Sequence, residues 1–175
     1  RQAAQAAALF DAVEVAAKTG DQARVNQAFD DIKARYAGTV QAAQAGLAVA
    51  KTQVDAGNAD AAKESLAWVA GHAGDEGLKA LARLRLASVL LDQKDYDEAL
   101  KQVSASAPPE FEAVFADRKG DILASQGKRP EAIAEYTKAY KAFEEGLEYR
   151  RLVEIKLGAL GVAPNGVAVA AAASS

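Results

Sequence analysis

The sequence predicts an all-α fold, a right-handed α-solenoid of about four helical hairpins followed by a C-terminal capping helix. Three observations support this prediction. The chain is 50% hydrophobic but only 6% aromatic, and alanine supplies much of its apolar content, which favours closely packed helices. No stretch alternates polar and apolar residues with a period of two over the length of a strand. The third observation is a turn signal that recurs along the chain.

The recurring signal is clearest from residue 120 to residue 139. Gly127 can adopt positive φ and so end a first helix, and Pro130 stands where a second helix would begin, at a position that needs no backbone donor. Ala132 and Tyr136 follow four residues apart, so they share one helical face. This order is the tetratricopeptide pattern, a helical hairpin that recurs about every 34 residues. One such hairpin cannot bury its own apolar face, so further copies are expected.

Three more copies of the turn are found, which places the turns at residues 20, 57, 94 and 127. Five residues after each turn stands a small residue that lets two helices approach, and four residues later a large one fills the space between repeats. The small residues are Val25, Ala62, Ala99 and Ala132, and the large residues are Phe29, Leu66, Val103 and Tyr136. The alternative is an alanine-rich bundle that matches by chance, because any single alanine match carries little weight.

The helices of the first two hairpins follow from apolar stripes and from the breaks between them. Leu9 and Val13 mark the first stripe, and Ile32 continues the second. Thr39 can cap the third helix by accepting a backbone N–H, and Trp68 belongs to the stripe of the fourth, where we expect it to fill space between helices rather than bind a ligand. The expected helices span residues 2–18, 22–36, 40–56 and 59–69.

The remaining helices begin after a glycine-rich loop at residues 71–77. The fifth is the most strongly apolar, and Pro108 with Pro109 ends the hairpin that it forms with the sixth. The expected helices span residues 79–93, 96–104, 111–126, 131–143 and 147–157. The helix at residues 147–157 carries charges along one side, as the solvent-exposed outer face of a terminal repeat element requires.

The predicted organisation is one tetratricopeptide-like repeat domain at residues 1–157 and an Ala/Gly-rich tail at residues 158–175. The tail contains no charge and no amphipathic period, so we expect it to be mostly disordered. The alternative is a short hydrophobic tail that packs on a partner. Its uncharged run is too poor in bulky residues for a membrane span.

Composition excludes several classes of function. The net charge of −3, with acidic and basic residues interspersed, provides no footprint for nucleic acid. The absence of cysteine excludes disulfides, thiol catalysis and a cysteine-built zinc site. The chain begins at Arg1 without a start methionine, so we expect an upstream segment such as a tag, a signal peptide or a membrane anchor.

Catalytic patterns are nearly absent. His72 is the only histidine and lies in the glycine-rich loop without an obvious nucleophile nearby, so we expect it to be an exposed loop residue. No nucleotide-binding or zinc-protease motif occurs. Asp95, Asp97 and Glu98 lack the ligand order of a calcium loop and suit the first turn of a helix instead. The sequence therefore predicts a protein that is not an enzyme and that uses no metal or cofactor.

A set of short motifs, in order along the chain, resembles the YfgM-type ancillary subunit of the SecYEG translocon. The motifs lie at residues 6–10, 36–39, 47–51, 84–87, 120–121, 139–140 and 154–157, and the similarity spans about residues 5–160. The resemblance implies a small bacterial inner-membrane protein with one N-terminal membrane helix, absent from this chain, and a tetratricopeptide-like domain on the periplasmic side. The partners it implies are SecYEG and a membrane-anchored periplasmic chaperone of the prolyl isomerase type, to which secreted chains would be passed.

The expected working surface is a protein-binding groove on the concave side, which the first helix of each hairpin lines in tetratricopeptide arrays. Its inward-facing positions are Phe10, Glu14, Leu47, Lys51, Val54, Leu84, Ser88, Leu91, Asp117 and Asp121. Apolar members could hold apolar side chains of an extended or helical peptide, and Lys51, Asp117 and Asp121 would fix its orientation. The alternative for the leucines is that they are ordinary core residues.

Two other functions compete with this interpretation. One is a different tetratricopeptide scaffold or adaptor, in envelope assembly or in the cytoplasm. The other is a hydrolase that would have to use His72. The residues that precede Arg1 separate the first two hypotheses best, because about 20 apolar residues there would constitute an anchor.

Overall fold

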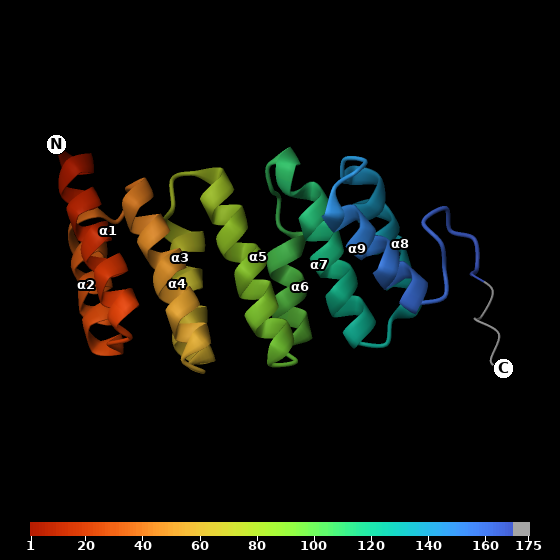
Figure 1. Cartoon of the computed structure of the whole chain (residues 1–175), viewed down its shortest axis with the longest axis horizontal. Helices are drawn as coiled ribbons and strands as arrows, with labels where there is room; N and C mark the ends of the chain where they lie inside the picture. Colours follow the sequence, from red (N-terminus) through yellow and green to blue (C-terminus); the bar gives the residue numbers. More distant parts are fainter. Residues whose placement is uncertain (170–175) are drawn as a thin grey trace. The chain divides into compact units, whose positions relative to one another are not determined.

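The computed structural model describes residues 1–169, and in this range it is helical apart from turns, short connections and one isolated bridge (Figure 1). The all-α prediction is therefore confirmed. The helices in the described range are α1 (Gln2–Thr19), α2 (Gln22–Tyr36), α3 (Val40–Asp55), α4 (Ala59–His72), α5 (Glu76–Asp92), α6 (Tyr96–Ser104), the 3-10 turn η1 (Pro109–Phe111), α7 (Glu112–Ser125), α8 (Arg129–Ala142) and α9 (Glu148–Ala159).

Short polar side chains set the beginnings of four helices. Asp21, Thr39, Asn58 and Asp75 each accept a hydrogen bond from the backbone N–H three residues further on, at 3.2, 3.1, 3.2 and 2.8 Å. Each bond satisfies a donor that the first turn of a helix would otherwise leave without a partner. These caps begin α2, α3, α4 and α5.

The predicted turns adopt the backbone conformation that the repeat requires. Gly20, Gly57 and Gly127 have φ values of 73°, 78° and 75°, and Lys94 has a φ of 60° at the equivalent place. Lys94 is the one residue other than glycine with positive φ in the part of the chain that the structure describes. All four turns therefore end a first helix as the spacing predicts.

The repeat register is confirmed by burial. The four small residues, Val25, Ala62, Ala99 and Ala132, are completely buried, and each of the four large ones, Phe29, Leu66, Val103 and Tyr136, is at most 5% exposed. Gly120 shows why small residues are needed, because a β-carbon there would lie 2.5 Å from the ring of Tyr136. The chain thus has the close helix contacts of a tetratricopeptide-like α-solenoid.

The chain divides into two compact units, so the expected repeat domain at residues 1–157 includes parts of both. Unit 1 is Arg1–Gln93 and contains α1 to α5, coloured red to yellow-green in Figure 1. Within it, α3 packs on both helices of the preceding hairpin around a core that includes Val13, Ile32 and Val49. Unit 2 begins at Lys94 and contains α6 to α9.

The core of unit 2 is built between its last three helices. α8 packs along α7 on one side and contacts α9 on the other. Tyr136 from α8 and Val153 and Leu157 from α9 are buried in this core together with Val162, which follows the last helix. The C-terminal helix therefore closes the α7–α8 hairpin.

Two segments differ from the sequence-based expectation. His72 is the last residue of α4 and does not lie in the loop, and its ring stacks on that of Trp68 with 4.7 Å between the centroids. The cap at Asp75 starts α5 at Glu76, three residues before the expected start at residue 79. α9 continues to Ala159, and the chain after it forms an antiparallel bridge between Val162 and Ala168. The tail expected to be disordered therefore has defined hydrogen bonds as far as Val169, and residues 170–175 lie outside the described residues.

None of the helices in the described range combines the length and the apolar character needed to cross a membrane.

Candidate functional site: a polarised groove in unit 1

A groove of about 370 Å³ lies between α3 and α5, the first helices of the second and third hairpins. Its base is apolar, with Ala50, Leu66 and Val89 each at most 9% exposed. Val54 extends this apolar strip towards solvent and is 46% exposed. The side chains that line the groove are Ala50, Lys51, Val54, Asp55, Leu66, Arg85, Ser88, Val89 and Asp92.

The rim of the groove carries four exposed charges, Lys51, Asp55, Arg85 and Asp92. None of the four forms an ion pair with another residue in the described range. Exposed charges that have no internal partner are available to a ligand. An apolar strip between available charges is the composition of a protein-interaction surface.

The signs of these charges are separated along the groove. The turns at residues 57 and 94 are 37 residues apart, so Lys51 is level with Ser88 and Asp55 is level with Asp92. Arg85 lies one turn before Ser88. Lys51 and Arg85 therefore make one end of the groove positive. Asp55 and Asp92, at the C-terminal ends of their helices where the helix dipole is negative, make the other end negative.

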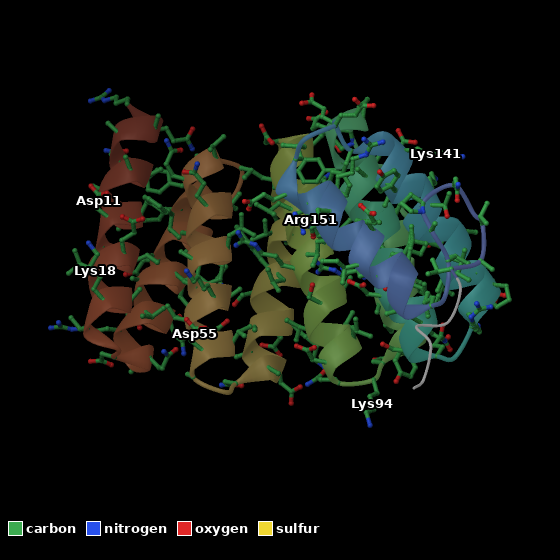
Figure 2. All side chains as sticks on the ribbon, turned by 45° about the vertical axis from the view of Figure 1, so that its right-hand side comes forward. Asp11, Lys18, Asp55, Lys94, Lys141 and Arg151 are labelled. Atoms are coloured by element: carbon green, nitrogen blue, oxygen red, sulfur yellow. The ribbon has the colours of Figure 1, made fainter. Side chains whose placement is uncertain are left out.

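A second groove of about 410 Å³ lies between α1 and α3 and shares Lys51 and Asp55 with the first. Here the charges alternate across the groove, because Glu14 and Lys18 of α1 are opposite in sign to the α3 residues at the same levels. Figure 2 shows Lys18 and Asp55 towards the same end of the unit. The first helices of unit 1 thus form a continuous grooved face, which we call the α1/α3/α5 face.

The structure distributes the predicted groove residues of unit 1 between the surface and the base of this face. Glu14, Lys51, Val54 and Ser88 line the two grooves. The apolar members are instead buried or half-buried: Phe10, Leu47, Leu84 and Leu91. This agrees with the alternative that the leucines are ordinary core residues. Sequence reasoning missed Asp55, Arg85 and Asp92. Asp55 and Asp92 occur at equivalent positions of neighbouring repeats, and this could have identified them.

Asp117 and Asp121, the predicted groove residues of unit 2, are held by the C-terminal helix. Lys156 of α9 donates to both carboxylate oxygens of Asp117, at 3.0 and 3.1 Å, and to Asp121 at 3.2 Å. Tyr136 donates its hydroxyl to Asp121 at 2.6 Å, and Tyr149 donates to Asp117 at 3.3 Å. Asp117 is completely buried. These five residues, which we call the α9 lock, orient a helix of this chain.

Sequence reasoning missed the α9 lock because it placed Lys156 on the wet side of the last helix. At the equivalent positions of the earlier repeats stand Phe10, Leu47 and Leu84, so an aspartate at position 117 departs from an apolar pattern. A carboxylate at a core position requires a buried cation or donors. That requirement is the signal that could have predicted a lysine partner.

Burial and charge shift the proton affinities within the α9 lock. Burial raises the pKa of Asp117, the nearby carboxylate of Asp121 raises it further, and the ammonium of Lys156 opposes both. Burial alone would lower the pKa of Lys156, but the two carboxylates outweigh it and raise that pKa above its ordinary value. Burial and the hydrogen bond to Asp121 raise the pKa of Tyr136, which keeps this hydroxyl a donor. At neutral pH the lysine is therefore charged.

The described residues contain no cluster of three or more histidine, aspartate or glutamate side chains that could hold a metal ion. His72 donates from Nδ1 to the carbonyl of Trp68 in its own helix, at 2.9 Å. The chemistry that the α1/α3/α5 face offers is recognition through apolar contact and charge.

Repeated helical hairpins with an open, polarised groove define a class, the tetratricopeptide-like protein-interaction modules. A family model described as a tetratricopeptide repeat-like domain matches residues 1–162. The chain is 35% identical over 155 residues to the ancillary SecYEG translocon subunit of Neisseria gonorrhoeae (strain ATCC 700825 / FA 1090), covering 89% of this chain and 74% of that protein. It is 34% identical over 87 residues to the protein of that name in Escherichia coli (strain K12), covering 50% of this chain and 42% of that protein. The chain belongs to the family of ancillary SecYEG translocon subunits.

Proposed function

We propose that this chain is the protein-binding module of a translocon accessory protein, with a role in binding rather than catalysis. The α1/α3/α5 face is the binding surface, and its occupant is an extended or helical segment of a protein. The observation that carries this proposal is the groove between α3 and α5, in which four charges without internal ion pairs surround an apolar strip. Such a groove matches a segment with apolar side chains between charged ones.

We further propose the binding partners of this module and its location in the cell. The module works on the periplasmic side of the bacterial inner membrane, where it receives secreted chains that emerge from SecYEG and passes them to a membrane-anchored periplasmic chaperone. The names of the two relatives support the translocon as a partner. A groove that recognises charge and apolar contact suits transient binding of many sequences.

Site-specific photocrosslinking tests the binding surface directly. A photoreactive amino acid is placed at Val54, which is 46% exposed in the groove, and in a second variant at the exposed Arg35 of α2 as the matched control. Each variant is incubated with SecYEG vesicles that are translocating a secretory chain. We expect crosslinks to the translocon or to the moving chain from the groove position and few from the control.

Charge reversal tests the role of the groove in affinity. Lys51→Glu with Arg85→Glu removes the positive end of the groove, and we expect binding of detergent-solubilised SecYEG to weaken about tenfold or more, as loss of charge complementarity does. Arg24→Glu on α2 reverses an exposed charge outside the groove and should leave binding unchanged. Melting temperatures of all variants exclude loss of fold as the cause. Equal affinity in all variants would contradict the proposed surface.

A further inference from the structure

The C-terminal helix presents an apolar outer surface. Leu147, Leu152 and Ile155 are 46%, 44% and 59% exposed, and they account for three of the nine exposed large apolar side chains among the described residues. The terminal element of a repeat array needs a polar outer face to stay in solution. A cluster of exposed apolar side chains on that element therefore marks an interaction site.

The exposed side chains lie opposite the part of α9 that packs on the hairpin. Val153 and Leu157 are completely buried against α7 and α8. Beside the outer face a cavity of about 720 Å³ opens between Tyr140 of α8 and the first turns of α9, with Leu147 and Ile155 in its lining. The surface is therefore hollowed as well as apolar.

Three exposed charges, Glu148, Arg151 and Glu154, share this outer face. Glu148 and Arg151 are exposed, three residues apart, and neither forms an ion pair within the described residues. The neighbouring Arg150 is different, because it donates to the carbonyl of Tyr140 at 3.0 Å and lies 4.1 Å from the ring centroid of that residue. Arg151, labelled in Figure 2, thus remains available to a partner.

The order of Leu147, Glu148, Arg151 and Leu152 along the chain is self-complementary. In a two-fold, antiparallel pair of helices, residue positions pair about one centre. The arrangement that sets Glu148 opposite Arg151 of a second copy is centred between residues 149 and 150, and the same centre sets Leu147 opposite Leu152. Glu148, Arg151 and Leu152 are spaced to lie on one side of α9, and Leu147 is the N-cap residue directly before it. One arrangement thus satisfies two ion pairs and two apolar pairs at once.

We propose that the outer face of α9 is a self-association surface, on which a second copy of this chain docks its own α9 antiparallel about a two-fold axis. Glu148 of each copy pairs with Arg151 of the other, and Leu147 of each copy contacts Leu152 of the other. One short helix per copy is a small interface, so the dimer forms reversibly at micromolar to submillimolar concentration.

Sedimentation velocity of the chain over that concentration range tests the proposal. The expected result is a shift from monomer to dimer as concentration rises, and Leu152→Asp should abolish the shift. A constant monomer mass up to several hundred micromolar overturns the proposal. Higher oligomers without a dimer plateau also overturn it, because a two-fold contact closes on itself.

Charge reversal identifies the paired residues. Glu148→Arg sets two cations opposite two cations and Arg151→Glu sets two anions opposite two anions, so each single variant should dimerise at least about tenfold more weakly. The double variant exchanges the signs and should recover wild-type association. An equimolar mixture of the two single variants should form a heterodimer, because one carries two cations at positions 148 and 151 and the other two anions.

The control is Arg24→Glu on α2, which changes the net charge as much as Arg151→Glu does. It should leave association unchanged. Dimers that form equally well in both single variants would overturn the proposal and place the contact elsewhere. Single variants that dissociate without recovery in the double variant or the mixture would overturn the pairing of Glu148 with Arg151.

Discussion

At the residue scale, the turns between paired helices show how one backbone angle constrains the choice of amino acid. Three of the four turns use glycine, and the fourth uses Lys94 with a φ of 60°. A side chain in this left-handed region has its β-carbon close to the following carbonyl oxygen, which costs about 1 kcal/mol or more. The third turn is therefore the strained member of the set.

Replacing Lys94 with glycine should stabilise the protein by about 0.5 to 1 kcal/mol, since relief of strain exceeds the added freedom of the unfolded chain. Urea unfolding measures the change. The converse substitution, Gly57→Ala at a φ of 78° with open space around the β-carbon, should destabilise by about 1 kcal/mol through strain alone. A destabilised Lys94→Gly variant would contradict this interpretation of the turn.

Gly120 is required for a different reason, the distance between two helices. Its added β-carbon would lie 2.5 and 2.6 Å from two ring carbons of Tyr136, whose hydroxyl is held by Asp121. Gly120→Ala should therefore cost about 1 to 3 kcal/mol by overpacking, despite the better helix propensity of alanine. Gly158→Ala in α9 is the control, because open space surrounds that position and the variant should be neutral or slightly stabilised. Equal stability of both variants would contradict the close approach of α7 and α8.

At the element scale, α9 is attached to its hairpin by an apolar seam and by the α9 lock. Lys156→Met would leave the carboxylate of Asp117, which is completely buried, without its ammonium partner. We expect this variant to lose about 3 to 5 kcal/mol, whereas Asp117→Leu combined with Lys156→Met should be close to neutral. Chemical denaturation measures both. A single variant as stable as wild type would mean that α9 is held without the lock.

The lock also predicts a dependence on pH. Burial raises the pKa of Asp117 above 3.8, so its ionised form opposes folding increasingly as pH rises through the raised value. In Lys156→Met no ammonium offsets that cost, and protonation of Asp117 removes it. The stability difference between this variant and wild type should therefore shrink as pH falls from 7 towards 3, in parallel urea titrations. A difference that stays constant or grows in acid would contradict the buried charge.

Alkaline conditions test the contribution of Lys156 to the α9 lock. Because the pKa of Lys156 is raised above 10.5, its contribution to stability is complete below that pH and is lost only as pH rises through the raised value. The apolar pair Asp117→Leu with Lys156→Met should not show this loss, which makes it the matched control.

At the scale of the whole molecule, stability resides in contacts between neighbouring hairpins, as in other repeat proteins. Ile32 is completely buried in the core of unit 1, and Trp68, the only tryptophan, packs against that core through Phe29. Ile32→Ala should lower the stability reported by tryptophan fluorescence by about 2 to 5 kcal/mol. The stability of Asn58→Ala, which removes only a cap, should fall by about 1 kcal/mol in the same measurement. Similar effects of the two would contradict the assignment of the core.

The sequence by itself determined the helices, their turns and the repeat register, because these depend on local signals. A glycine, a capping side chain and residues spaced by four act within one or two turns of helix, and they recur from hairpin to hairpin. Asp21, Thr39, Gly57 and Ala62 can each be interpreted in this way from the amino-acid sequence alone. The alanine at position 62 is completely buried, as expected for a small residue where two helices meet.

Only the tertiary structure decided which side chains remain available to a partner. Asp117 and Asp121 have the same spacing in their helix as Leu47 and Lys51, yet they contact Lys156, which lies 39 and 35 residues later in the chain. Lys51 instead stays exposed beside an apolar strip. The same holds for α9, whose charges suggested a wet face although Leu152 and Ile155 are exposed between them. Local periodicity places a residue on one side of a helix, but whether that side meets a helix, a lysine or water depends on packing between segments far apart in the sequence.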